Sequence, residues 1–501
     1  MAVDFTGFYH ETKGRYAYAV DLETLHVRLR CGKGAVDSVR LLYFDPFDWA
    51  EGKDKIYHLA DVREVSMKLE QSTRHHDWWF AEISAPKRVK YGFIVEDYLY
   101  GTDGEYLFTS ASKQSHIFYN FPYILAEDIF KAPEWVAQTV WYQIFPERFA
   151  SGNIAKIPGI TERLDYINDL GFTGIYLTPI QKSPSYHKYN TEDYYEIDPS
   201  FGTKDDFREL VEEAHKRGIK IMLDLVFNHI GDTNPIWGQV EKSDWFHIKS
   251  DGTYETFAME KHMPKWNTGN PDARKYLMDV ALYWAEFGVD GFRLDVANEV
   301  SHDFWREFRR LIKSRYPDMF ILGELWDDGM PWLLGDQFDS VMNYSLAAAI
   351  WKFVSGETNW QGLREDIAKY LTMYPKDRQK FLFNLLGTHD TDRILTICKG
   401  DKRKLKQALL ILLSFAGSPM IFYGDEIGIE GEGHDGTRKP MIFESTKIDG
   451  ELRSFVKKLI AMRKEYDDMR SVDVEWINDT SYKKGQLIIN LESLEVDVHL
   501  C

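Results

Sequence analysis

The stretch Gly291-Phe-Arg-Leu-Asp-Val-Ala-Asn-Glu-Val300 decides how the chain around it is interpreted. Its first four residues predict a short buried strand that ends on a carboxylate, Asp295. Arg293 lies two positions earlier, so both side chains point to the same face of the strand. We expect the buried Arg293 to keep Asp295 ionised, as an attacking carboxylate requires. A purely structural ion pair at a strand end is the alternative that this decapeptide alone leaves open.

From about residue 139 onward, short apolar runs alternate with amphipathic helices. The predicted strands are Thr139–Pro146, Gly174–Ile180, Ile219–Phe227, Gly291–Asp295, Phe320–Leu325, Ser340–Asn343, Phe381–Thr388 and Pro419–Tyr423. A helix between two of them has Thr203 as its cap and Gly218 at its end. Eight such units in about 330 residues favour an α/β fold of the (β/α)8, or TIM, barrel type. A doubly wound open sheet is the alternative, but no Gly-rich nucleotide loop follows any strand.

Three further regions flank or interrupt the predicted barrel, which spans residues 131–470. Residues 1–130 predict an N-terminal β-sandwich, because Leu25, Val27, Leu29 and Cys31 alternate with polar residues as in a half-buried strand. Residues 231–266, after strand three, are a compact insertion that we expect to form a small B domain. Residues 471–501 leave room for only a short, truncated C-terminal β region, with strands at Val474–Ile477 and Leu487–Leu491.

Two adjacent tryptophans, Trp78 and Trp79, mark the predicted sandwich. Neighbouring residues of a strand point to opposite faces, so we expect one ring in the core and the other on the surface. A surface ring could stack on a sugar, or it could pack on the next domain or on a dimer partner. The sequence leaves these alternatives open.

Composition narrows the class of protein and its partners. The 501-residue chain has a net charge of -18, which argues against nucleic acid and anionic membrane as partners and is compatible with a neutral substrate. The N-terminus has no basic segment followed by an apolar run, and no apolar stretch is long enough to span a membrane. The three cysteines have no ligand-like spacing and indicate a reducing, cytoplasmic location without structural zinc: Cys31, Cys398 and Cys501.

Polar residues follow four of the predicted barrel strands at their carboxyl ends, where a barrel of this type carries its active site. They occur in Asp224-Leu-Val-Phe-Asn228-His229, Arg293-Leu-Asp295, Gly323-Glu324-Leu-Trp326 and Thr388-His389-Asp390. The three carboxylates Asp295, Glu324 and Asp390, with His and Arg donors beside them, are suited to glycoside hydrolysis: one attacks the anomeric carbon and another exchanges the proton. The two histidines lack metal-ligand spacing, so we expect no metal.

These motifs resemble the conserved regions of the α-amylase family, glycoside hydrolase family 13. The motif Met263-Pro-Lys-Trp-Asn267 and the ending Val296-Ala-Asn-Glu299 resemble its neopullulanase, cyclomaltodextrinase and maltogenic amylase branch, as does the preceding β-domain. The resemblance implies that Asp295 is the nucleophile, Glu324 the general acid/base and Asp390 the stabiliser of the transition state. It further implies these substrate contacts: Tyr189, His229, Arg293, Asn298, Glu299, Trp326 and His389.

The same resemblance implies a retaining hydrolase that cleaves α-1,4 bonds of cyclodextrins and maltooligosaccharides, with pullulan and transfer to sugars as further options. An oligo-1,6-glucosidase and a glucan-binding barrel without catalysis are the alternatives; the three retained carboxylates argue against the second. Relatives pair through the N-terminal domain, so we expect a homodimer.

The link between Arg148 and Thr161 is too short for the calcium loop of relatives and retains only Asn153 and a few small residues, so no cofactor is expected.

Overall fold

The computed structural model describes residues 3–51, 57–59, 62–84, 88–107, 117–149 and 156–499. The chain forms two compact units. One comprises Met1–Lys131 with Gln361–Gln379, and the other comprises Ala132–Trp360 with Lys380–Cys501. Asn153 and Cys501 lie outside the described residues.

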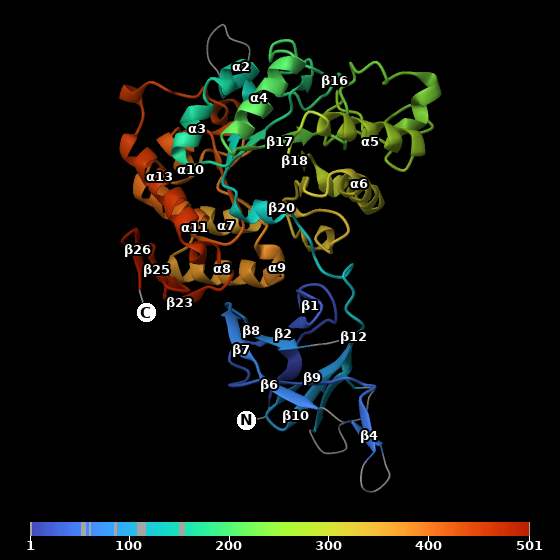
Figure 1. The fold of residues 1–501 in the computed structure, drawn as a ribbon, viewed down its shortest axis with the longest axis vertical. Helices are drawn as coiled ribbons and strands as arrows, with labels where there is room; N and C mark the ends of the chain where they lie inside the picture. Colours follow the sequence, from blue (N-terminus) through green and yellow to red (C-terminus); the bar gives the residue numbers. More distant parts are fainter. Residues whose placement is uncertain are drawn as a thin grey trace. The chain divides into compact units, whose positions relative to one another are not determined.

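The first unit is a β-sandwich, drawn in blue in Figure 1. One sheet has the order β1-β2-β8-β7 and the other β11-β10-β9-β3-β6, with β12 beside β9. Apolar side chains from both inner faces, Leu25, Val27 and Phe93 among them, form its main core. The strands are β1 Ala17–Ala19, β2 Thr24–Gly32, β3 Arg40–Phe44, β6 Arg63–Ser66, β7 Lys68–Ser72, β8 His76–Ser84, β9 Val89–Val95, β10 Tyr98–Gly101, β11 Gly104–Leu107 and β12 Tyr119–Phe121; β4 Trp49–Glu51 and β5 Tyr57–Leu59 pair separately.

The predicted half-buried pattern of β2 is wrong, because the polar face of this strand is covered as well. Arg28 is completely buried and binds Glu70 through Nε and Nη2, each at 2.8 Å. Its Nη1 donates to the carbonyl of Tyr374 at 2.9 Å. Residues 361–379, which include most of α8 Trp360–Met373 and all of α9 Lys376–Gln379, therefore cover this face within the first unit.

The prediction that Trp78 and Trp79 divide between core and surface is also wrong, since both are buried. Trp79 belongs to the sandwich core. Trp78 lies on the other face of β8 and stacks on Tyr16, with ring centroids 5.2 Å apart. Neither ring is exposed for stacking on a sugar in this unit.

The second unit contains a closed barrel of eight parallel strands, so the predicted fold class is confirmed. Its strands, in barrel order, are β13 Trp141–Ile144, β14 Gly174–Leu177, β17 Lys220–Leu225, β18 Gly291–Leu294, β19 Phe320–Gly323, β20 Ser340–Asn343, β21 Phe383–Leu385 and β22 Ser418–Phe422. Every predicted barrel strand contains or overlaps one of them, and most observed strands are shorter at their carboxyl ends. There the backbone leaves the barrel in the loops that carry the polar motifs.

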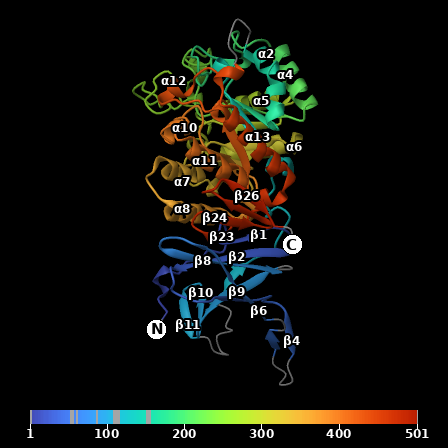
Figure 2. The same ribbon diagram turned by 90° about the vertical axis from the view of Figure 1, so that its left-hand side faces the viewer.

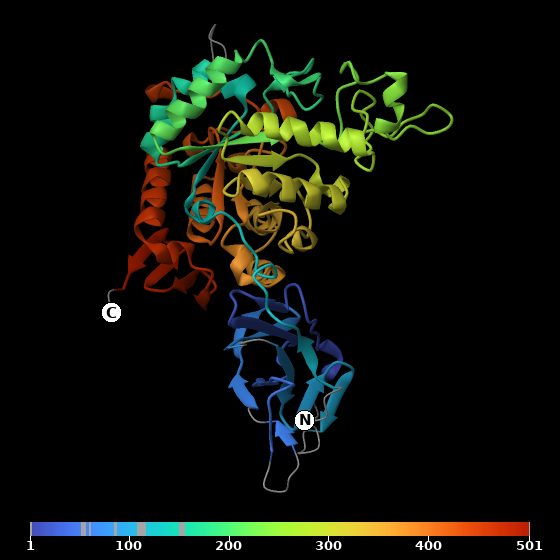
Figure 3. The ribbon, with the colours of Figure 1, turned by 45° about the vertical axis from the view of Figure 1, so that its right-hand side comes forward.

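Helices surround the barrel (Figure 1), and Figure 3 shows α5 and α6 side by side on its outside. The helices are α1 Pro146–Phe149, α2 Lys156–Thr161, α3 Leu164–Leu170, α4 Lys204–Lys216, α5 Pro271–Ala285, α6 His302–Arg315, α7 Tyr344–Ser355, α10 Ile394–Ile397, α11 Lys402–Ser414, α12 Gly433–Thr437 and α13 Gly450–Glu465. The expected cap of α4 is present, because Thr203 and Asp206 form a capping box. Asn270 caps α5 in a similar way, with its side chain accepting from two backbone N–H groups.

The C-terminal β region is a sheet of four strands rather than the two that were predicted: β23 Glu475–Asn478, β24 Ser481–Lys484, β25 Leu487–Asn490 and β26 Glu495–Val498. Figure 2 shows these strands near the end of α11. Tyr482 of β24 hydrogen-bonds to Ser414, the last residue of α11. The buried Lys484 donates to the carbonyls of Ser414 and Met469, so its Nζ satisfies the last carbonyl of α11. A two-stranded sheet, β15 Gln181–Lys182 with β16 Asp193–Ile197, shapes the loop after β14.

Candidate active site

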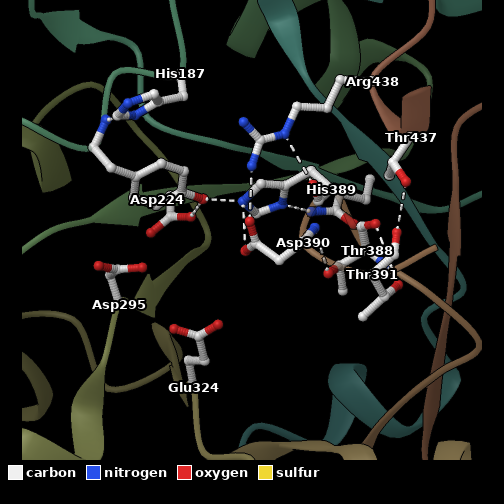
Figure 4. A network of polar contacts seen from close by, with 12 residues as sticks. His187, Asp224, Asp295, Glu324, Thr388, His389, Asp390, Thr391, Thr437 and Arg438 are labelled. Atoms are coloured by element: carbon white, nitrogen blue, oxygen red, sulfur yellow. Dashed lines mark hydrogen bonds and ion pairs between the residues drawn. The ribbon is translucent and has the colours of Figure 1, made fainter. Parts of the chain in front are cut away.

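Neighbouring strands of the barrel bring the predicted carboxylates together. Asp224 in β17 pairs in register with Arg293 in β18, and Leu294 pairs with Gly323. The residues that follow this second pair, Asp295 and Glu324, therefore leave the barrel at the same level. Asp390 comes from the loop after β21. Figure 4 shows that Asp295, Glu324 and Asp390 turn their carboxyl groups toward the same space.

Arg293 is the centre of this cluster and is completely buried. Its Nη1 lies 2.7 Å from Oδ1 of Asp295 and 2.9 Å from both carboxylate oxygens of Asp224. Its Nη2 lies 2.6 Å from Oε1 of Glu324. The guanidinium of Arg293 thus contacts three carboxyl groups, and the predicted contact with Asp295 is one of these three.

The expectation that Arg293 keeps Asp295 ionised is wrong in its simple form. Burial raises the pKa of Asp295 well above its usual range. Arg293 lowers that pKa, but the neighbouring charges of Glu324 and Asp224 raise it again. The neighbouring carboxylates therefore offset part of the stabilisation that Arg293 gives to the anion of Asp295.

The backbone after Asp295 also fixes the carboxyl group of Glu324. The N–H of Val296 donates to Oε2 of Glu324 at 2.9 Å. Val296 has a φ of 45°, a left-handed conformation that is unfavourable for a β-branched residue. The N–H of Ala297 donates to the main-chain carbonyl of Glu324 at 3.2 Å. Glu324 is therefore oriented from two sides, by Arg293 and by this turn.

Asp390 has its own pair of donors. Nε2 of His389 lies 2.9 Å from its Oδ2, and Nη2 of Arg438 lies 2.9 Å from its Oδ1. Burial alone would raise the pKa of Asp390, but His389 and Arg438 outweigh it, with Arg293 adding to their effect, and hold that pKa well below its usual range. Asp390 is therefore an anion at neutral pH. Arg438 also donates to the carbonyl of His389 and to Oη of Tyr186, each at 2.9 Å.

His389 and Tyr189 link Asp390 to Asp224. Nε2 of Gln143 lies 2.9 Å from Nδ1 of His389, and the other ring nitrogen of His389 is Nε2. That nitrogen faces Oη of Tyr189 at 2.7 Å, and the tyrosine hydroxyl donates to Asp224 at 2.9 Å. The two rings are parallel, at an interplanar angle of 6°. Tyr189, predicted as an aromatic platform for the sugar, also orients the carboxylate at the base of the site.

His229 lies against the site with an unused donor. Nδ2 of Asn228 donates to Nδ1 of His229 at 3.3 Å, so the ring proton lies on Nε2. Burial lowers the pKa of His229 to about 3, and the ring is neutral at working pH. Its buried Nε2 has no partner in the described part of the protein. A buried donor without an acceptor is costly, and the hydroxyl of a bound sugar would satisfy it.

The three remaining predicted residues lie at the exposed edge of the site's loops. Asn298 and Glu299 belong to one short turn, Ala297–Glu299, and both are exposed. Oε2 of Glu299 contacts Nζ of Lys265 at 2.9 Å and Nδ2 of Asn228 at 3.2 Å. Trp326 is 47% exposed and stacks on the buried Tyr344, with ring centroids 3.9 Å apart. A half-exposed ring backed by a second ring offers a flat face to a sugar.

Several contacts of the site were not predicted from the sequence: Gln143, Tyr176, Lys265 and Arg438. Gln143 and Tyr176 lie within apolar strands, where one polar residue in an inward position is the signal that could have found them. Lys265 lies inside a quoted motif but was given no role. Arg438 is in the loop after β22, and no pattern around it indicates that it contacts Asp390.

In the described ranges, no three His, Cys, Asp or Glu side chains gather in an arrangement that would ligate a metal ion. Among the same residues, no helix has the length and hydropathy of a bilayer span. The expectation of a site without cofactor stays a prediction.

Known proteins resemble this chain over nearly its whole length. It matches the family description "Alpha amylase, catalytic domain" over residues 143–493 and "Alpha amylase, N-terminal ig-like domain" over residues 5–125. A cyclomaltodextrinase of Geobacillus thermopakistaniensis (strain MAS1) is 44% identical over 511 residues, which cover 94% of this chain and 86% of that protein. An intracellular maltogenic amylase of Bacillus subtilis is 40% identical, with 95% and 87% covered. A solved structure of a cyclomaltodextrinase matches with a TM-score of 0.90 at 36% identity, covering 96% of this chain and 90% of that one.

The chain belongs to the α-amylase family, glycoside hydrolase family 13, in its neopullulanase, cyclomaltodextrinase and maltogenic amylase branch. It is a glycoside hydrolase that acts on α-glucans. The predicted family and enzyme class are confirmed.

Proposed function

We propose that this protein is a retaining hydrolase that cleaves α-1,4-glucosidic bonds of cyclodextrins and maltooligosaccharides. The observation that carries the proposal is the cluster of Asp295, Glu324 and Asp390 around one space, with Arg293 bonded to the first two. The names of two relatives of this chain, cyclomaltodextrinase and maltogenic amylase, support this choice of substrate. Pullulan and transfer to a sugar acceptor are further reactions that the same site would support.

The proposed reaction assigns one role to each carboxyl. An oxygen of Asp295 attacks the anomeric carbon while the glycosidic bond breaks, and Glu324 gives its proton to the leaving oxygen. Water then gives a proton to Glu324, its oxygen bonds to the anomeric carbon, and the bond to Asp295 breaks. The anion of Asp390 stabilises positive charge that develops on the sugar ring. The reaction requires Asp295 to be ionised and Glu324 to carry the proton when substrate is bound.

Neutral donors complete the proposed site. Nε2 of His229 is an unused donor and is placed to bind a sugar hydroxyl. Tyr189 and His389 form a continuous aromatic surface beside Asp390. Trp326, Asn298 and Glu299 are assigned to the binding of the leaving-group sugar, and the half-exposed ring of Trp326 supports this assignment. The net charge of -18 fits a neutral glucan rather than a phosphorylated sugar.

The test compares the wild type with Asp295→Asn on β-cyclodextrin, maltotriose and pullulan, with products separated by chromatography. We expect the wild type to open the cyclodextrin ring with retention of anomeric configuration and the variant to lose at least about a thousandfold in rate, as when a nucleophile is removed. Isomaltose serves as the control for the oligo-1,6-glucosidase alternative. Turnover by a folded Asp295→Asn protein at the wild-type rate would disprove the assignment.

We also propose that two copies associate through the N-terminal sandwich. In that unit, Phe47 is 70% and Tyr123 is 52% exposed, and the guanidinium of Arg88 lies between their rings at 4.3 and 5.0 Å. Exposed aromatic and Arg side chains are enriched at protein interfaces. Light scattering at micromolar concentration should give twice the chain mass for the wild type. The substitution Phe47→Ser should lower this measured mass, and a monomeric wild type would refute the proposal.

Action inside the cell is a further part of the proposal. Cys31 and Cys398 are both free and buried in the described structure. Cysteines that are not joined in disulfides suit a reducing compartment. Fractionation of cells that produce the protein should recover the activity with the cytoplasm, and recovery from the medium would contradict this.

A further inference from the structure

The loop after β14 contains a buried ion pair directly beside a residue of the site. Nζ of Lys188 lies 2.7 Å from Oδ2 of Asp198. The two side chains are 7% and 9% exposed, so the pair is removed from bulk solvent. Lys188 is followed by Tyr189, whose hydroxyl donates to Asp224. The proposed reaction itself uses neither Lys188 nor Asp198.

The backbone of Lys188 has an unfavourable conformation. Its φ is 68°, in the left-handed region that residues with a long side chain seldom adopt. Val296, next to Asp295, shares this property. Such a conformation persists only where the surrounding structure holds it, and it is concentrated at functional sites. The contacts that hold Lys188 therefore bear on the position of its neighbour, Tyr189.

Three contacts hold the side chain of Lys188. Besides its bond to Asp198, Nζ donates to the carbonyl of Ser183 at 3.4 Å and lies 5.2 Å from the centre of the Phe201 ring. Asp198 is itself fixed, because its Oδ1 accepts from the N–H of Ser200 at 3.0 Å and from its hydroxyl at 2.6 Å. The ammonium of Lys188 is thus bound to an acceptor that is already held in place.

Stability alone does not account for this ion pair. Moving two charges from water into a protein interior costs free energy that their attraction often only offsets, and apolar residues of similar volume are frequently as stabilising. A buried ion pair is better explained where it selects one conformation among several. The pair of Lys188 and Asp198 meets this condition, because it holds a backbone conformation that is unfavourable for a lysine.

The bend at Lys188 determines where Tyr189 points. The N–H of Tyr189 donates to Nδ1 of His187 at 3.1 Å, a bond that spans Lys188. Burial lowers the pKa of His187 to about 4, so its ring is neutral at neutral pH and able to accept this bond. Oη of Tyr189 then lies 2.9 Å from Oδ2 of Asp224 and 2.7 Å from Nε2 of His389. A change of φ at Lys188 would move this hydroxyl away from its partners.

We infer that Lys188 is a positioning residue of this hydrolase: its ion pair with Asp198 holds the left-handed bend that sets the position of Tyr189. The inference rests on the proposed function, and it assigns Lys188 no contact with substrate. Without the ion pair, the bend relaxes in most molecules. The Tyr189 hydroxyl then no longer joins Asp224 to His389, and only the molecules that retain the bend are fully active.

The test compares two double variants that both remove the ion pair. Lys188→Met with Asp198→Asn removes both charges and keeps a long side chain at the strained position. Lys188→Gly with Asp198→Asn removes the same charges, but glycine adopts the left-handed conformation without strain. Replacing both partners avoids an unpaired buried charge, which would destabilise the fold. The matched control is Lys182→Met with Glu192→Gln, because this pair in the same loop has an N–O distance of 2.6 Å but is 43% and 26% exposed.

Each variant is first checked for its fold by circular dichroism, and kcat/KM is then measured on β-cyclodextrin. We expect the Met/Asn variant to lose about tenfold, the factor that corresponds to the strain of one left-handed residue. The Gly/Asn variant should stay within about threefold of the wild type, because its bend needs no ion pair. The control variant should match the wild type. In a Tyr189→Phe background, the loss caused by the Met/Asn substitutions should shrink, because the hydroxyl that the bend positions is absent.

Three outcomes would overturn the inference alone. A Met/Asn variant that matches the control variant would show that the ion pair does not position Tyr189. Equal losses in the Met/Asn and Gly/Asn variants would show that the pair acts through general packing instead of through the bend. An undiminished loss in the Tyr189→Phe background would show that Lys188 does not act through the tyrosine hydroxyl. A wild type that hydrolyses none of the α-glucans would overturn the proposed function, and the inference with it.

Discussion

Arg438 provides the sharpest test of how the site controls its carboxylates. The substitution Arg438→Gln removes the charge and leaves an amide too short to keep the three contacts with Asp390, His389 and Tyr186. Arg438 is 5% exposed, so water would not easily replace it. Asp390 would keep its contact with His389 and the effect of the charge on Arg293.

The magnitude follows from the contact that is lost. A hydrogen bond to a charged group contributes about 1.5–3 kcal/mol, which corresponds to about a 10- to 150-fold change in rate. We therefore expect kcat/KM on β-cyclodextrin to fall by about this factor. The pKa of Asp390, which Arg438 helps to hold down, should rise toward its ordinary value. Activity requires the anion, so the acid limb of the pH–rate profile should move to higher pH.

The assay measures kcat/KM on β-cyclodextrin from pH 3 to pH 9 for the wild type, Arg438→Gln and Lys439→Gln. Lys439 is the adjacent residue and is exposed, so its substitution removes one cation without touching Asp390. That control should keep the wild-type profile. If activity falls but the acid limb does not move, Arg438 does not control the pKa of Asp390. A loss smaller than about threefold would show that Arg438 does not position Asp390 either.

Three further predictions concern stability, protonation and metal. Asp339→Asn should lower the free energy of unfolding by about 3–5 kcal/mol in urea titrations, because this completely buried carboxylate binds Arg309, Lys313 and the N–H of Ile321; a loss below 1 kcal/mol would contradict it. His229 should show no ring titration by NMR between pH 5 and pH 8, because its pKa is about 3, and a transition near pH 6.5 would show that the ring is hydrated instead of buried. Dialysis against EDTA should leave the activity on maltotriose intact, and recovery of lost activity by added Ca²⁺ would contradict the expectation of no metal.

The barrel and the position of its site could be predicted from the sequence because one geometric rule connects them. Parallel strands of a barrel end on one face, so polar residues at strand ends must meet there. Asp295, Glu324 and Asp390 were found on this basis, and the strand register places the first two at the same level. Their roles in the reaction stay predictions until variants are measured.

Contacts between loops could not be predicted in this way, because the geometry of the barrel strands does not determine them. Arg438 reaches Asp390 because the loop after β22 folds back over the loop after β21, where Oγ1 of Thr437 donates to the carbonyl of Thr391 at 2.9 Å. Nothing in the local sequence predicts that the loop after β22 folds back in this way. The same holds in the sandwich, where Arg28 occupies an alternating polar position but is buried by residues more than 340 positions away. Periodicity describes a strand's own faces, and it cannot say what covers them.

The charge state of Asp295 likewise could not be predicted from the local sequence. In the decapeptide Gly291–Val300, Arg293 and Asp295 form a pair of opposite charges, and such a pair predicts a lowered pKa. The fold adds Asp224 from β17 and Glu324 from β19 to the same guanidinium. One cation then faces three buried carboxyl groups, and burial together with the neighbouring charges raises the pKa of Asp295 instead of lowering it. A retaining hydrolase needs one ionised and one protonated carboxyl at that place. The surplus of acidic groups around Arg293 therefore weakens the simple ion pair, and the decapeptide could not reveal it because Asp224 and Glu324 come from neighbouring strands.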